Sequence, residues 1–253
     1  MSTCLTTTYA DSVCTLTLHP PEGKPPTLDH AVMHQFEHAL TAIEGSGAEL
    51  SAVVLQSASP KYFCAGANLK IMETIDQHSI VPWVERGHRL MNRIAALPPP
   101  TVARVEGYAL GGGLELAMAC DLIFASDLAR FGQPEAKLGL VTGWGGSYRL
   151  YQRVGLARAK ELAFTGRIFD ASEAVRLGVA EWQGDTAGLA RHLDEFLRSV
   201  AGNGRVAVRE MKQILEACTR TRLDDNAAIE AASSQRCLAD GDTAQRLQKF
   251  FRR

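Results

Sequence analysis

Residues 106–117 read Glu-Gly-Tyr-Ala-Leu-Gly-Gly-Gly-Leu-Glu-Leu-Ala, with three consecutive glycines between two apolar runs. The run before them, Thr101 to Val105, has the composition of a buried strand, and the run after them, Leu114 to Cys120, is typical of a helix. Glycines at such a junction allow a tight backbone path and close approach of a ligand. The N–H groups that open the helix lack intrahelical acceptors, so the turn favours an anion or a developing oxyanion.

Comparable strands and helices alternate on either side of this unit. Strand-like apolar runs cover Val13 to Leu18, Ser51 to Gln56 and Asp121 to Ala125. A helical apolar stripe follows Asp29, which is a suitable N-cap, and another covers Val81 to Ala96 before three prolines. Strands separated by helices indicate an α/β fold, with a largely parallel sheet covered by helices.

The pattern changes beyond about Gly166. Four stretches there are typical of helices, and none has a convincing strand pattern: Ala171 to Leu177, Gly188 to Val200, Val206 to Thr219 and Asp224 to Leu238. We therefore predict an α/β core over residues 1–190, which holds the functional site, and a helical C-terminal segment over residues 191–253.

The composition excludes several classes of protein. The chain has 253 residues and a formal net charge of −1, without the basic excess of a general nucleic-acid binder. It shows no secretory signal pattern and no apolar run long enough for a membrane span. Its 6 cysteines form no CxxC pair, which favours free thiols in a reducing compartment. We expect a cytoplasmic protein that binds neither nucleic acid nor membrane.

Two acidic residues stand in apolar surroundings near the glycines. Glu115 opens the helix that follows them, and Glu135 lies in Phe-Gly-Gln-Pro-Glu. A carboxyl group that is removed from water has a raised pKa, which suits proton transfer near neutral pH. Taken alone, each acid is most simply interpreted as a helix cap or a surface charge. Together, beside a helix N-terminus built from glycines, they indicate a catalytic site.

Several ordered motifs make the chain resemble the enoyl-CoA hydratase/isomerase (crotonase) superfamily, with the hydratases nearest in motif. They are the opening stretch, Phe-Cys-Ala-Gly-Ala-Asn-Leu-Lys at residues 63–70, Cys-Asp-Leu-Ile-Phe-Ala at 120–125, Phe-Gly-Gln-Pro-Glu-Ala-Lys-Leu-Gly-Leu at 131–140, and Gly-Trp-Gly-Gly-Ser-Tyr-Arg-Leu at 143–150. The resemblance implies a crotonase (ClpP-like) fold of repeated ββα units. It also implies homotrimers or dimers of trimers, with the C-terminal helices at subunit contacts.

The same resemblance assigns roles to residues. It implies that the backbone N–H groups of Ala67 and Gly112 bind the thioester oxygen of an acyl-CoA as charge develops there. It implies that Glu115 and Glu135 hold a water and transfer protons in syn addition across the 2,3 double bond of a 2-enoyl-CoA. Because both acids are present, hydration is favoured over double-bond isomerisation. An acyl-CoA decarboxylase and a weakly catalytic acyl-CoA-binding protein stay open as alternatives.

Further residues are expected beside the substrate, and three of them depart from the family pattern. The expected contacts are Lys24, Ala65, Gly66, Asn68, Leu69, Gly111 and Trp144. Asn68 stands where the family usually has Asp, and Lys24 begins a segment that differs from the family. Trp144 occupies the family's Pro-Gly-x-Gly-Gly loop, where it either shapes the acyl pocket or packs beneath the loop.

No cofactor or metal is expected, because the CoA thioester is itself the substrate. Local cations must hold its phosphates, and the candidates are Lys24, Lys61, Lys70, Lys249, Arg252 and Arg253. His30, His34 and His38 recur on one helix face opposite an apolar stripe, so we expect them to face solvent rather than to form a metal site.

Overall fold

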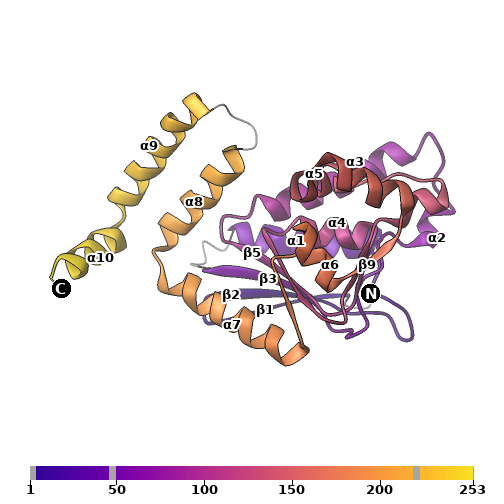
Figure 1. Ribbon diagram of the computed structural model, residues 1–253, viewed down its shortest axis with the longest axis horizontal. Coiled ribbons are helices and arrows are strands. Elements are labelled where there is room, and N and C mark those ends of the chain that lie inside the picture. The colour runs from indigo at the N-terminus through magenta and orange to yellow at the C-terminus, as the bar shows by residue number, and fades with distance from the viewer. Residues whose placement is uncertain (1–3, 46–49, 219–222, 253) are drawn as a thin grey trace.

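Two β-sheets and the helices around them make up the computed structural model, which describes residues 4–45, 50–218 and 223–252 (Figure 1). The larger sheet has the strand order β1-β2-β3-β5-β7-β10. Its strands are β1 (Leu5–Ala10), β2 (Val13–Leu18), β3 (Ala52–Ser57), β5 (Thr101–Val105), β7 (Leu122–Ser126) and β10 (Trp182–Gly184). All neighbours pair in parallel except β1 and β2, which form an antiparallel hairpin.

The smaller sheet has the strand order β4-β6-β8-β9. It contains β4 (Tyr62–Cys64), β6 (Tyr108–Leu110), β8 (Arg130–Gly132) and β9 (Ile168–Asp170). The first three strands pair in parallel, and β9 is antiparallel to β8. The chain alternates between the sheets, because β3, β5 and β7 of the larger sheet are each followed by a strand of the smaller one. This alternation agrees with the repeated ββα units that the family resemblance implies.

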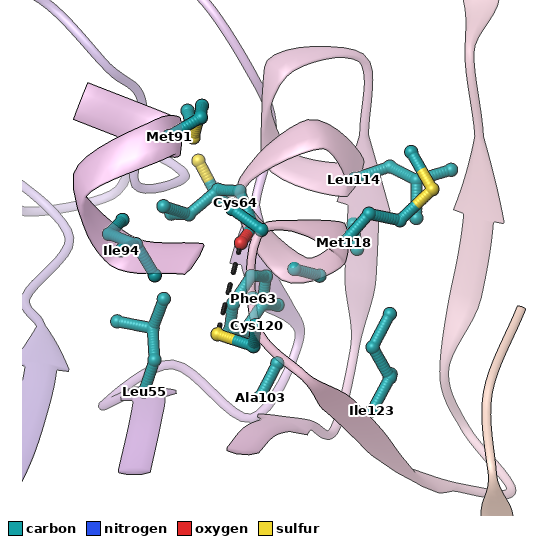
Figure 2. Close-up of a cluster of buried hydrophobic side chains, with 14 of the residues drawn as sticks. Leu55, Phe63, Cys64, Met91, Ile94, Ala103, Leu114, Met118, Cys120 and Ile123 are labelled. Atoms are coloured by element: carbon teal, nitrogen blue, oxygen red, sulfur yellow. Dashed lines mark hydrogen bonds between the residues drawn. The ribbon is translucent and has the colours of Figure 1, made fainter. Parts of the chain in front are cut away.

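The main core lies between the larger sheet and helices α1 (His30–Gly45), α3 (Ile80–Ala95) and α4 (Gly112–Met118). Figure 2 shows part of it, where Leu55 and Ala103 of the sheet face Ile94 of α3 and Leu114 of α4. The opposite face of the sheet packs against α7 (Thr186–Gly202). Consecutive strand residues point to opposite faces, so both sets of apolar residues on a central strand are buried.

The remaining helices surround this core or extend from it. They are α2 (Leu69–Met72), the 3₁₀ helix η1 (Pro134–Leu138), α5 (Gly146–Thr165), α6 (Ala171–Leu177), α8 (Arg205–Cys218), α9 (Leu223–Ala239) and α10 (Gly241–Phe251). Figure 1 shows α8, α9 and α10 standing to one side of the sheets. An ion pair of 2.8 Å between Lys212 and Asp121 joins α8 to the core. The predicted division at residue 190 falls inside α7, which lies on the larger sheet.

Several predicted elements agree with the structure, and one prediction is wrong. Asp29 caps α1, since its Oδ1 accepts hydrogen bonds of 2.9 Å from the N–H groups of Ala31 and Val32. The absence of strands beyond Gly166 is wrong, because β9 and β10 lie there. The strand β4 is also not among the predicted strands. All three strands have 3 residues and are too short for an alternating pattern to show.

Candidate active site

Three chain segments meet where strands of the smaller sheet end. Ala67 follows β4, Gly112 follows β6, and Glu135 follows β8. These three strands are parallel neighbours, so their carboxyl ends lie side by side at one edge of the sheet. The topology therefore brings together the two predicted N–H donors and one of the two predicted acids.

Glycines let the segments approach backbone to backbone. A Cβ atom on Gly113 would overlap the carbonyl of Cys64 at the end of β4. A Cβ atom on Gly66, whose φ is +96°, would lie 2.8 Å from the carbonyl oxygen of Leu110 and 3.1 Å from the nitrogen of Gly112. Only glycine fits both positions, and the start of α4 is held against the loop that carries Ala67.

The N–H groups of Ala67 and Gly112 are suited to bind an oxyanion. A Cβ atom on Gly112 would lie 3.4 Å from the nitrogen of Ala67, so the two backbone segments are in contact. Gly112 is the first residue of α4, where an N–H has no intrahelical acceptor. Among the hydrogen bonds of the described residues, neither N–H donates to a protein group. A ligand oxygen beside both would receive two donors at a helix N-terminus.

The expected substrate-binding segments lie alongside this pair of donors. The nitrogen of Ala65 donates to the Pro26 carbonyl over 2.9 Å, and Leu28 donates to Gly66 over 2.8 Å. These bonds place the chain that follows Lys24 beside the Ala67 loop. Asn68 keeps a capping role despite its departure from the family pattern, because its Oδ1 accepts from the N–H of Lys70 over 3.1 Å. Leu69, in the first turn of α2, is exposed.

Glu115 is buried and firmly held. Its Oε1 accepts hydrogen bonds of 2.7 Å from the backbone N–H groups of both Trp144 and Gly146, and the residue is 2% exposed. Burial raises the pKa of this carboxyl, whereas the two N–H donors and the nearby charge of Arg149 lower it. The net effect is a raised pKa, and the loop over residues 143–146 opposes that rise while it holds the carboxyl in a position from which water is largely excluded.

Glu135 has a different environment. The pKa of its carboxyl is raised to about 7; burial is the main cause, its own backbone N–H opposes the rise, and the charge of Glu115 contributes to it. A Cβ atom on Gly111 would lie 3.1 Å from its Oε1, so this carboxyl lies against the glycine turn. Its Oε2 is buried and has no hydrogen-bond partner among the described residues. Glu135 is therefore suited to carry a proton near neutral pH.

Two residues that the sequence does not single out also belong to the site. Gln133 is 2% exposed, and neither polar atom of its amide has a partner among the described residues. A Cβ atom on Gly146 would overlap its Nε2 and lie 2.8 Å from Oε1 of Glu115. Unpaired polar atoms are rare in protein interiors, and their presence on Gln133 beside Glu115 and on Glu135 indicates a place for a polar ligand or water.

The second residue is Arg149, which supports the loop behind Glu115. Its Nη1 donates to the carbonyl of Trp144 over 3.0 Å, and its Nη2 donates to Oδ1 of Asn92 over 2.7 Å. These bonds tie the loop to α3. An arginine near a glycine-rich turn is ordinary in a sequence, so only the folded geometry shows that it supports this carboxyl.

The other predicted residues lie around this site or outside it. Trp144 is buried beneath its loop, which agrees with one of the two alternatives that the sequence offers. Its ring also borders Gly112. Lys24, Lys61, Lys70, Lys249 and Arg252 are exposed, and Arg253 lies outside the described residues. The three histidines of α1 are exposed as predicted.

The described ranges contain no candidate metal cluster and no candidate membrane span. No group of three or more His, Cys, Asp or Glu side chains there is placed to bind a metal ion. No helix there combines the length and the apolar character that crossing a bilayer requires.

Comparisons with known proteins agree with the arrangement. The family model described as enoyl-CoA hydratase/isomerase matches residues 8–253. A protein named short-chain-enoyl-CoA hydratase from Clostridium acetobutylicum is 33% identical over 88% of this chain and 85% of its own length. One named crotonyl-CoA hydratase from Syntrophomonas wolfei is 31% identical over 88% of this chain and 86% of its own.

A solved structure extends the likeness to three dimensions. The enoyl-CoA hydratase from Bacillus anthracis superposes with a TM-score of 0.93 at 31% identity, covering 99% of this chain and 96% of that one. The match therefore includes both sheets and the C-terminal helices. By its sequence motifs, its fold and these relatives, the chain belongs to the enoyl-CoA hydratase/isomerase family.

Proposed function

We propose that the chain is an enoyl-CoA hydratase, a hydro-lyase that adds water across the 2,3 double bond of a 2-enoyl-CoA. The observation that carries this proposal is the pair of carboxyls in unlike environments, beside two backbone N–H groups. Glu115 is held by two N–H donors, whereas burial raises the pKa of Glu135 to about 7. The names of the relatives from Clostridium acetobutylicum and Syntrophomonas wolfei support the same activity.

The unlike environments assign the two acids to different roles. Burial raises the pKa of both carboxyls, but only Glu115 receives two backbone hydrogen bonds that stabilise a carboxylate. With one proton shared between the two acids near neutral pH, we therefore place it on Glu135. Glu115 is then the general base and Glu135 the general acid. This division of roles is part of the proposal.

The addition step balances with these two groups alone. The oxygen of a water bound between the acids forms a bond to C3 as Glu115 takes one of its protons. The electron pair of the double bond moves toward the thioester oxygen, which the N–H groups of Ala67 and Gly112 stabilise. C2 of the resulting enolate then takes the proton of Glu135. Exchange with solvent restores the initial protonation of both acids.

The rest of the substrate would lie outside the sheet edge. The exposed side chains of Lys24, Lys61 and Lys70 are the nearest proposed partners for the phosphates of CoA, since they flank the loop that carries Ala67. No residue role in this step needs a further cofactor. The absence of a cofactor and the cytoplasmic location stay predictions of the sequence.

An assay with crotonyl-CoA tests the activity. Loss of the enone absorbance, with formation of 3-hydroxybutyryl-CoA identified by mass spectrometry, is the expected result. Appearance of a product with a shifted double bond would support an isomerase, and release of carbon dioxide from a malonyl-type thioester would support a decarboxylase. Tight binding of acyl-CoA with no turnover would support the binding-protein alternative.

The pKa of Glu135 makes the pH profile a separate test. We expect kcat/KM for hydration to fall above about pH 7, because the active form keeps one proton on the pair of acids and loses it in that range. Above that pH, kcat/KM should fall tenfold per pH unit. Measuring initial rates from pH 5 to pH 9 checks it, and a flat profile between pH 6 and pH 9 would contradict the role given to Glu135.

We further propose that the chain forms a homotrimer or a dimer of trimers. A groove between the core and α8 is lined by residues that include Asn92, Tyr148, Arg153 and Lys212. Tyr148, Tyr151, Met211 and Leu215 nearby are about half exposed or more, and α9 and α10 stand away from the sheets (Figure 1). Subunit contacts would cover these apolar side chains.

Light scattering after size-exclusion chromatography measures the assembly directly. Since one chain has a mass of 27.4 kDa, we expect a particle of about 82 or 164 kDa. A single species near the mass of one chain at micromolar concentration would contradict the assembly without bearing on the hydratase activity.

A further inference from the structure

The indole of Trp144 fills the space between two helices. It lies between Gly87 of α3 and Gly112 of α4, and both glycines touch it. A Cβ atom on Gly87 would overlap the five-membered ring at Cδ1 and Nε1. One on Gly112 would overlap the six-membered ring at Cζ3 and lie 2.7 Å from Cε3. The side chain fits only because both facing positions lack a Cβ atom.

Trp83 closes this space from the outside. Its ring centroid lies 5.3 Å from that of Trp144, with the planes at 62°, an edge-to-face contact. Trp83 and Trp144 are 5% and 2% exposed. His30 packs on Trp83 in turn, at a centroid distance of 4.9 Å. The Trp144 ring therefore cannot swing outward unless this stack of rings moves with it.

The same residue touches both halves of the proposed catalytic machinery. Its backbone N–H holds Oε1 of Glu115, and its ring lies against Gly112, whose N–H is a proposed oxyanion donor. In a 2-enoyl thioester, only three bonds separate the carbonyl oxygen from C3. A substrate that reaches both Gly112 and Glu115 therefore places the carbons beyond C3 next to the indole.

We propose that Trp144 ends the acyl pocket and makes the enzyme selective for short-chain 2-enoyl-CoA substrates of about four to six carbons. The inference rests on the proposed hydratase function, because it places the thioester at Ala67 and Gly112. Trp144 acts here as a specificity-determining residue through its side chain, in addition to the backbone contact with Glu115. Longer chains meet a buried ring backed by Trp83.

Chain-length profiles of two enzymes test the proposal. We expect kcat/KM of the natural enzyme for 2-decenoyl-CoA to be at least 100-fold below its value for crotonyl-CoA, since one misfit methylene already costs about 10–200-fold. In Trp144→Ala, the ratio of kcat/KM for 2-decenoyl-CoA to kcat/KM for crotonyl-CoA should rise at least tenfold. The ratio is the readout because any general damage to Glu115 lowers both values together.

Two further variants separate pocket length from stability. Trp144→Phe is smaller than the natural residue and should move the ratio in the same direction by less, so the test survives if Trp144→Ala does not fold. Trp182→Ala is the matched control. Trp182 lies in β10 of the larger sheet, and its ring stacks on His192 at a centroid distance of 4.6 Å. This control variant should leave the ratio unchanged, and thermal melting establishes that each variant is folded.

Several results would overturn the proposal. One is a natural enzyme that hydrates the four-carbon and ten-carbon substrates equally well; another is a ratio that Trp144→Ala and Trp144→Phe leave unchanged. If crotonyl-CoA is not hydrated at all, the proposed hydratase function is wrong. The length of the acyl pocket is then tested by measuring the binding of acyl-CoAs. Calorimetric titration with butyryl-CoA and decanoyl-CoA should then show tighter binding of the shorter chain, with the preference reduced in Trp144→Ala. Equal dissociation constants would reject the pocket assignment.

Discussion

Replacing Glu115 with Gln should lower kcat for hydration of crotonyl-CoA by about 10²–10⁴, the usual contribution of a positioned general base. The amide keeps the size of the carboxyl, and its oxygen can still accept from Trp144 or Gly146, so the loop that holds the side chain should stay in place. What the variant loses is the group that accepts a proton from water. A stopped assay with liquid chromatography measures the residual rate over hours.

Proton exchange at C2 distinguishes the roles of the two acids. Butyryl-CoA has no 2,3 double bond to hydrate, but Glu135 can exchange the C2 protons of its acyl chain with deuterium from solvent. We expect Glu115→Gln to keep most of this exchange and Glu135→Gln to lose it, while both lose hydration. Glu195→Gln on the exposed face of α7 is the matched control and should behave as the natural enzyme. Exchange that survives in Glu135→Gln and disappears in Glu115→Gln would reverse the assignment.

The sequence predicts the larger sheet better than the smaller one, for a physical reason. Strands β2, β3, β5 and β7 are buried runs of five or six residues, and their composition is visible locally. Strands of the smaller sheet have 3 residues each, and pairing with distant segments makes them strands. This is why β9 escapes sequence reasoning, although β8 pairs with all three of its residues.

The site is predictable where its chemistry is local to a motif. The acids and the glycine turn stand close together in the sequence, and the family pattern points to Ala67. Gln133 and Arg149 are not predictable in this way, because their significance lies in distances across the fold. The amide of Gln133 is notable only because it is buried unpaired beside Glu115, and Arg149 because it joins α3 to the loop behind that acid.

The two interpretations of Trp144 do not exclude each other. The sequence offers a pocket wall or a packing side chain as alternatives. In the structure the ring packs in the core, and the residue it packs against is itself a proposed oxyanion donor. Gly87 makes the position possible from another helix, and no local motif connects it with Trp144.

Removing the N–H of Gly112 should produce the second large loss of activity. Gly112→Pro deletes the donor, and loss of one oxyanion donor typically costs about 10²–10³ in kcat. Proline is compatible with the first position of a helix, where the lost N–H has no intrahelical acceptor, so α4 should keep its own hydrogen bonds. The new ring also presses on Trp144, because a Cβ atom there would lie 2.7 Å from Cε3.

A set of paired variants isolates the donor from this overlap. Gly112→Ala adds the Cβ atom but keeps the N–H, so the difference between Ala and Pro at this position reports the donor. Adding Trp144→Ala to each removes the overlap. We expect Gly112→Ala to recover most of its activity in that background and Gly112→Pro to stay at least 100-fold lower, with kcat affected more than KM because the bond strengthens as charge develops. Equal rates for the two double variants would show that the Gly112 N–H does not stabilise the oxyanion, and Ala67 alone would then have to supply the donor on this side of the thioester.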